Sequence, residues 1–183
     1  GEKPVLKTDD MTLTVRYDEK FIYFLVRKGG ISLKKQKLYI PIDITARSGS
    51  LYCCNENILM DRPAAFLMII DGEKNSRVLV QERYEALRST YSVNVKDYDT
   101  YIKGNIPDKD SPEFVPVNMI LQTATALIYK DNLAAAEVYE TGKLKYGNAN
   151  PASADFDSLA DFMCGDDFIE IKLPWQLLNF ADP

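Results

Sequence analysis

The stretch around residue 148 brings together side chains suited to recognising a sugar. Tyr146, Asn148 and Asn150 stand at every second position, and Glu140 precedes them by a few residues. Aromatic rings offer an apolar face for stacking, while amide and carboxylate groups exchange hydrogen bonds with hydroxyls. The run 147–151 also has ordinary turn chemistry, because asparagine bonds its own backbone and tolerates left-handed conformations. A ligand site and a structural turn therefore both fit this segment.

A second candidate cluster closes the clearest predicted hairpin. It consists of Gln81, Glu82, Arg83 and Tyr84. On an exposed strand face these side chains would hydrogen-bond a sugar, with Glu82, Arg83 and Tyr84 as the binding residues. A solvated sheet face is normally polar in any case, so surface polarity is the alternative interpretation.

Metal and cofactor chemistry has weak support in the sequence. Asp43, Asp61 and Asp71 carry oxygen ligands of the kind that calcium takes, but no acidic loop with regular calcium-binding spacing is present. Capping of turns is the alternative role for each aspartate. We expect no cofactor, with calcium as the one ion to test.

Catalysis has to do without histidine, which the chain lacks. Serine and cysteine triads that use histidine, HExxH zinc sites and histidine-ligated haem are excluded within this chain. A pair of carboxylates for glycoside hydrolysis could come from Glu140, Asp155, Asp157 and Asp161. A solvated acidic loop explains these residues equally well, and we expect a protein that is not an enzyme.

Composition indicates one folded domain over residues 1–183, and we expect this domain to be part of a larger protein. The 183 residues are 46% hydrophobic, and the net charge is −5. Cations cluster only in short groups such as 34–37, so nucleic acid is not expected as a partner. No run approaches the roughly 20 apolar residues of a membrane span. Cys53, Cys54 and Cys164 give neither a disulfide framework nor zinc-binding spacing.

Alternating and apolar runs predict many short strands. They lie at 11–17, 21–27, 37–44, 64–71, 76–84, 114–121, 133–140 and 168–173. The unbroken apolar run 21–27 predicts a central strand covered on both faces, and Pro41 predicts an edge strand, because proline cannot donate to the ladder. Residues 45–64 are expected as a long connection. The fold class is therefore an all-β antiparallel β-sandwich, immunoglobulin-like in outline, with long loops at 85–113 and 140–162.

The only tryptophan, Trp175, follows the last predicted strand and Pro174. Proline at this point predicts the start of a helical turn, since its missing N–H does no harm there. The indole is expected to be buried across the end of the sandwich, with its N–H bonded.

Four segments carry a resemblance to a known superfamily. They are VRYDEKFIYFLV (15–26), LYIPIDI (38–44), the turn at Asp71-Gly72 and the closing IEIKLPWQLL (169–178). Together they resemble the β-sandwich superfamily of family 9 carbohydrate-binding modules and DOMON-like domains. Residues 139–162 are also similar to a segment of large bacterial surface proteins. The resemblance implies a non-catalytic carbohydrate-binding module, located outside the cell or at the surface of a bacterium.

The chain departs from this superfamily in two ways. Sugar-binding members use a pair of aromatic side chains, usually tryptophans, whereas Trp175 occupies a position that is structural in the family. Haem-binding DOMON relatives use histidine and methionine ligands, and histidine is absent. The expected partner is a glycan. The alternative function is that of a module without a sugar site, which would dock to neighbouring domains of the parent protein.

Overall fold

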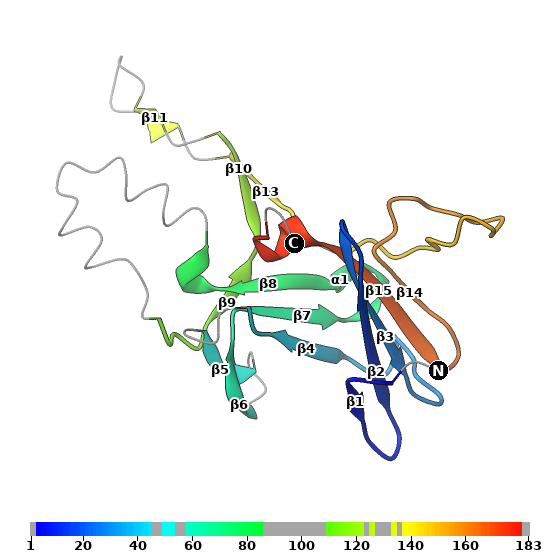
Figure 1. Ribbon diagram of the computed structural model, residues 1–183. Helices are drawn as coiled ribbons and strands as arrows, with labels where there is room; N and C mark the ends of the chain where they lie inside the picture. Colours follow the sequence, from blue (N-terminus) through cyan, green and yellow to red (C-terminus); the bar gives the residue numbers. More distant parts are fainter. Residues whose placement is uncertain are drawn as a thin grey trace. The chain divides into compact units, whose positions relative to one another are not determined.

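Strands dominate the computed structural model, which describes residues 3–44, 49–53, 58–85, 109–122, 125–126, 133–134 and 137–180 (Figure 1). Within these residues, helix is confined to α1 (Gly72–Asn75) and two 3-10 turns, η1 (Glu82–Tyr84) and η2 (Trp175–Leu178). The fold is all-β and sandwich-like, with several antiparallel sheets, as the sequence predicted.

The chain divides into two compact units, each described by itself. The first unit contains residues 1–38, 69–77 and 143–183, and the second contains residues 39–68 and 78–142. A single domain over residues 1–183 stays a prediction.

A five-stranded antiparallel sheet forms the centre of the first unit. Its strand order is β1 (Leu6–Lys7), β2 (Thr12–Tyr17), β3 (Phe21–Arg27), β15 (Phe168–Pro174) and β14 (Phe162–Cys164). Strands β2 and β3 form the predicted hairpin. The last long strand of the chain, β15, pairs with β3 over its full length, and this pairing places residues about 150 positions apart side by side.

One face of this sheet, here called the inner face, is buried. Its buried side chains are Phe24, Val26, Phe162, Ile169, Ile171 and Leu173. Side chains alternate between the two faces of a strand, so the intervening residues of β2, β3 and β15 form the opposite face, here called the outer face. Phe21, Tyr23 and Leu25 lie there and are only half-buried, so the prediction that 21–27 is covered on both faces is wrong.

The second unit holds most of a four-stranded sheet with the order β4 (Leu38–Ile42), β7 (Phe66–Ile70), β8 (Arg77–Gln81) and β9 (Phe114–Pro116). Strand β4 is at the edge and Pro41 is exposed, which confirms the prediction from its missing N–H. Strands β7 and β8 are joined by α1, which begins at Gly72 with φ +66. That left-handed conformation favours glycine.

Further strand pairs lie in the second unit: β5 (Ser50–Cys53) with β6 (Ile58–Ala64), β10 (Asn118–Gln122) with β13 (Glu137–Glu140), and β11 (Thr125–Ala126) with β12 (Leu133–Ala134). The expectation that 45–64 is only a connection is wrong. Strands β5 and β6 were missed because their apolar side chains do not alternate and Pro63 interrupts the second run.

Candidate binding site on the outer face of the five-stranded sheet

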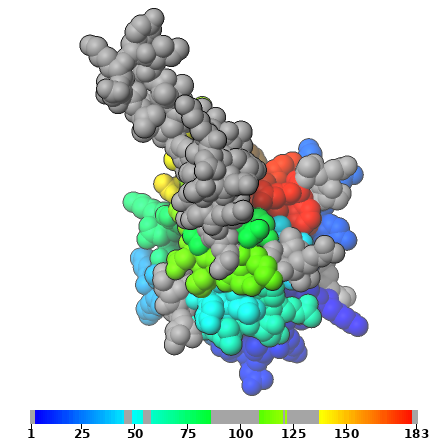
Figure 2. Space-filling view, turned by 90° about the vertical axis from the view of Figure 1, so that its left-hand side faces the viewer, coloured from blue at the N-terminus to red at the C-terminus, as the bar shows by residue number. Residues whose placement is uncertain are grey.

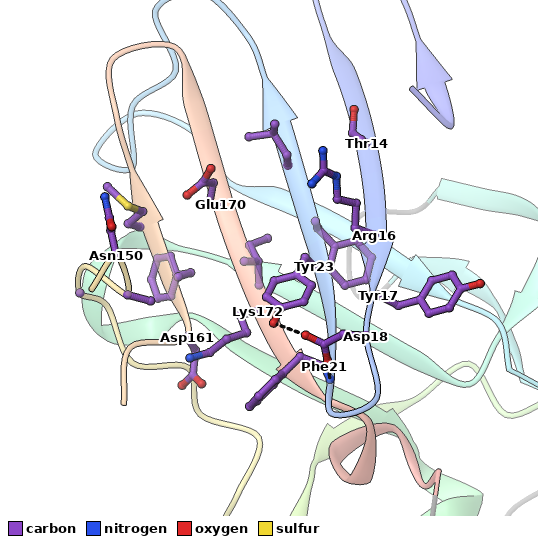
Figure 3. A pocket seen from close by; sticks show the side chains of 17 residues that line it. Thr14, Arg16, Tyr17, Asp18, Phe21, Tyr23, Asn150, Asp161, Glu170 and Lys172 are labelled. Atoms are coloured by element: carbon purple, nitrogen blue, oxygen red, sulfur yellow. Dashed lines mark hydrogen bonds between the residues drawn. The ribbon is translucent and has the colours of Figure 1, made fainter. Parts of the chain in front are cut away.

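The register of β2, β3 and β15 sets two rows of side chains across the outer face. Arg16, Tyr23 and Lys172 are cross-strand partners in the first row. Thr14, Leu25 and Glu170 form the second. Such neighbours lie about 5 Å apart and act together on whatever contacts the sheet. Figure 3 shows the polar side chains of both rows projecting from neighbouring strands.

These rows form the floor of an open cleft of about 800 Å³. The cleft is also lined by the β2–β3 turn and by the loop before β14, which contribute Asp18, Asn150 and Asp161. All of its lining residues belong to the first unit. A cleft of this size falls in the range of small-molecule sites, which combine apolar walls with a few polar groups.

Asp18 fixes the turn at one end of the cleft. Its Oδ1 accepts hydrogen bonds from the backbone N–H groups of Lys20 and Phe21, both at 2.8 Å. Its Oδ2 accepts the hydroxyl of Tyr23 at 2.7 Å, shown dashed in Figure 3. The Tyr23 hydroxyl, followed by the two backbone donors, lowers the pKa of Asp18, and the carboxylate in turn raises the pKa of Tyr23. The ring of Tyr23 is therefore held in place over the sheet.

Two neighbouring aromatic rings contribute to the apolar surface of the cleft. Phe21 and Tyr23 lie with their centroids 6.2 Å apart and their planes tilted by 54°. The ammonium group of Lys172 lies 5.1 Å from the centroid of the Phe21 ring. At this distance a cation is attracted to the ring face, which steadies the long lysine side chain.

Asp161 stands at the cleft edge and is half-buried. Its Oδ2 accepts the backbone N–H of Lys145 at 2.8 Å. Burial raises the pKa of Asp161, and the hydrogen bond from Lys145 and the positive charge of Lys172 oppose that rise. Nearby, the ammonium of Lys145 lies 2.7 Å from Asp157, and this contact lowers the pKa of Asp157.

Charges of both signs line the cleft. The cations are Arg16 and Lys172, and the carboxylates are Asp18, Asp161 and Glu170. The signs nearly balance, so the cleft has no strong preference for an ionic ligand. Donors and acceptors beside aromatic rings suit a neutral ligand rich in hydroxyl groups.

Among the residues singled out from sequence around position 148, only Asn150 lines this cleft. Its side-chain oxygen accepts the N–H of Ala152 at 3.0 Å. Asn148 accepts the N–H of Asn150 at 2.9 Å and donates to Ser153 at 3.0 Å. Tyr146 packs edge-on against Phe162, with centroids 5.4 Å apart. The turn interpretation thus accounts for the contacts of both asparagines, while Glu140 belongs to the second unit.

The cluster at the end of β8 lies in the second unit, and most of it forms η1 rather than a strand face. Gln81 is buried, donates to the carbonyl of Ser111 at 3.0 Å and accepts the N–H of Arg83 at 3.3 Å. Glu82 accepts the hydroxyl of Ser111. Arg83 and Tyr84 are exposed. A ligand-binding role for Glu82, Arg83 and Tyr84 stays a prediction.

Trp175 is half-buried, so the prediction of full burial is wrong, but its predicted hydrogen bond is present. The indole N–H donates to the carbonyl of Asp18 at 2.8 Å. The helical turn predicted after Pro174 is confirmed as η2. The ring is only partly covered, and the short η2 turn ends at Asn179, which has φ 64.

The three predicted calcium ligands have separate local environments. Asp43 and Asp61 are exposed, and Asp71 pairs with Lys37 at 3.0 Å. Across the residues that the structure describes, no three histidine, cysteine, aspartate or glutamate side chains gather in a way that could hold a metal ion. In the same residues, helices long and apolar enough to cross a membrane are absent.

Two cysteines lie in the described part of the chain, and both are thiols. Cys53 is buried and Cys164 is half-buried, and neither forms a disulfide within the described residues. Burial is the main cause of the raised pKa of the Cys164 thiol. Cys54 lies outside the described residues.

The outer-face residues were missed by the sequence analysis, although a signal for them existed. Arg16 and Lys172 are polar members of the two alternating runs 11–17 and 168–173, which the sequence analysis interpreted only as strands. Their shared row depends on the β3–β15 pairing. Comparison of the chain with protein-family models, with curated proteins and with solved structures found no match.

Proposed function

We propose that this chain is a non-catalytic carbohydrate-binding module of a bacterial secreted or cell-surface protein, and that the outer-face cleft holds the glycan. The observation that carries the proposal is the row Arg16, Tyr23 and Lys172 beside the ring of Phe21, on the floor of an open cleft. An aromatic ring flanked by hydrogen-bonding groups offers a sugar both its stacking surface and its polar contacts. The resemblance of residues 15–26 and 169–178 to family 9 modules supports the same function.

The ligand we propose is a neutral oligosaccharide. Cations and carboxylates are nearly balanced in the cleft, so little net charge is available to compensate the cost of removing water from an ion. An uncharged polyol does not have this cost. An open cleft accepts part of a longer chain, which suits a glycan that continues beyond the protein.

The hydrogen bonds and the ionisation of Asp18 support a non-catalytic role for the cleft. Both of its oxygens accept hydrogen bonds and its pKa is lowered, so it stays ionised and is unsuited to act as a general acid. The cleft carboxylates Asp18 and Asp161 each hold a backbone N–H group in place. These contacts account for both carboxylates as structural groups.

The test is a thermal-shift and titration-calorimetry screen against mono- and oligosaccharides, with calcium and with a chelator. We expect saturable binding of one sugar class, unchanged by the chelator. Glu170→Ala should weaken it about tenfold, the equivalent of one hydrogen bond to a charged group. Glu137→Ala is the matched control, because Glu137 is also an exposed glutamate on a strand. Binding that Glu170→Ala leaves intact but Tyr84→Ala or Tyr146→Ala abolishes would move the site to those residues.

A second candidate function, docking of neighbouring domains, is favoured by one observation. Exposed apolar side chains lie on two separate strand pairs, β5 with β6 and β10 with β13: Leu51, Tyr52, Ile58, Leu59, Met119, Leu121, Val138 and Tyr139. Residues of β5 and β6 form the cyan surface in Figure 2. Contiguous exposed apolar patches larger than a few hundred Å² mark interaction sites. Docking would be favoured if no glycan of the panel binds and if the amide hydrogens of β6 are protected from exchange in the longer parent protein.

A further inference from the structure

A second cleft lies at the end of the β2–β3 hairpin, and its walls are aromatic. It measures about 500 Å³ and is lined by Tyr17, Asp18, Glu19, Trp175 and Phe180. All five residues belong to the first unit. Tyr17 is 77% exposed, so the cleft opens to solvent.

The rings stand as walls at steep angles. Trp175 and Tyr17 have centroids 6.2 Å apart and planes at 66°. Trp175 and Phe180 have centroids 5.4 Å apart and planes at 76°. A sugar ring stacks on a flat aromatic face, whereas rings that meet at steep angles surround a compact, rounded group. The geometry therefore favours a compact ligand over a flat one.

The two walls formed by Trp175 and Phe180 are held in place by hydrogen bonds. The indole N–H donates to the carbonyl of Asp18 at 2.8 Å, and the backbone N–H of Trp175 donates to the carbonyl of Lys20 at 3.1 Å. Asn179, in the left-handed conformation, turns the chain after η2, and the N–H of Phe180 then donates to the carbonyl of Trp175 at 3.1 Å. A site whose walls are fixed in advance loses little entropy on binding.

The two acidic side chains of this cleft, Asp18 and Glu19, differ in their contacts. The carboxylate of Asp18 is occupied by the turn and by Tyr23. Glu19 is exposed at the cleft and supplies a negative charge beside the rings. Aromatic faces and a nearby carboxylate both attract positive charge, and methylated ammonium groups are the cations that aromatic cages recognise.

We propose that this aromatic cleft binds a quaternary ammonium group, such as that of choline. Trp175, Tyr17 and Phe180 contact the methyl groups, and Glu19 balances the charge. This site shares Tyr17 and Asp18 with the lining of the glycan cleft but recognises a cation instead of a neutral ligand, so the proposal stands whether or not the chain binds sugars.

The test uses Trp175 as its own reporter, because it is the only tryptophan in the chain. Choline chloride is titrated while tryptophan fluorescence is followed, with sodium chloride at matched ionic strength. The key comparison is dimethylbutanol, a neutral isostere in which carbon replaces the quaternary nitrogen. We expect a saturable change with choline and binding of the isostere at least about fivefold weaker, as loss of a cation–π attraction implies.

Substitutions test whether the fluorescence change arises from choline bound in the aromatic cleft. Tyr17→Leu should weaken choline binding about fivefold, and Glu19→Gln should weaken it about twofold to threefold. Tyr52→Leu is the matched control, since Tyr52 is also an exposed strand tyrosine, and it should change nothing. Co-sedimentation with phosphatidylcholine vesicles assigns the ammonium to a lipid headgroup, and choline binding without sedimentation assigns it to a soluble ligand.

Three results would overturn the proposal. One is equal affinity for choline and its neutral isostere, which would leave only an apolar pocket. Another is undiminished choline binding by both Tyr17→Leu and Glu19→Gln. The last is displacement of choline by a neutral sugar at comparable concentration, which would make the cleft a sugar platform. The glycan-cleft proposal is tested by Glu170→Ala, so its failure is distinguishable from this one.

Discussion

Replacing Leu173 by alanine tests whether the inner face of the five-stranded sheet stabilises the first unit. Leu173 lies in β15 opposite Ile22 and is 0% exposed. The change removes about three carbon groups at about 0.8 kcal/mol each, or about 2.4 kcal/mol of transfer free energy. The cavity left behind raises the expected loss in free energy of unfolding to about 3–4 kcal/mol.

Urea and thermal unfolding followed by Trp175 fluorescence measure this loss, because the reporter lies in the same unit. For a chain of this size the loss corresponds to a fall in Tm of about 6–16 °C. Leu159→Ala is the matched control: it removes the same atoms from a side chain that is 71% exposed, and it should cost less than about 0.5 kcal/mol. The reasoning is refuted if Leu173→Ala is as stable as the control protein.

Two further predictions concern backbone geometry and pH. Gly142→Ala should destabilise the protein by more than about 1 kcal/mol in urea unfolding followed by circular dichroism, because a Cβ there would lie 2.3 Å from the carbonyl oxygen of Val78. Gly29→Ala, where a Cβ meets nothing within 4 Å, should be neutral, and equal costs for the two variants would contradict the steric argument. Since its folded-state pKa is lowered, Asp18 contributes stability that is fully present above its ordinary pKa of 3.8 and is lost as the pH falls through the lowered value. Asp18→Asn should therefore be less stable at neutral pH and lose less stability on acidification than the unmodified protein, and parallel stability curves for the two would show that the carboxylate is not linked to folding.

Local pattern was enough to predict the strands that have a strong period. The alternating runs 11–17 and 168–173 correspond to β2 and β15, and the apolar run 21–27 corresponds to β3. Pro41 marked an edge strand because its missing N–H is a local property.

Pairing between distant segments could not be predicted in the same way. The candidate site depends on Lys172 lying opposite Tyr23, and no local pattern specifies that register. Trp175 was expected to be buried because apolar residues surround it in sequence, yet it is only half-buried at the start of the short η2 turn. Strands β14 and β1, which have two or three residues, are too short to show a period.

The central claim is that the outer face of the five-stranded sheet binds a glycan. Amide NMR spectra recorded during titration with the most active oligosaccharide of the panel test it most directly. The account predicts saturable shifts concentrated at Arg16, Tyr23, Glu170 and Lys172. Saturable shifts confined to the second unit, or no shift with any glycan, would contradict it.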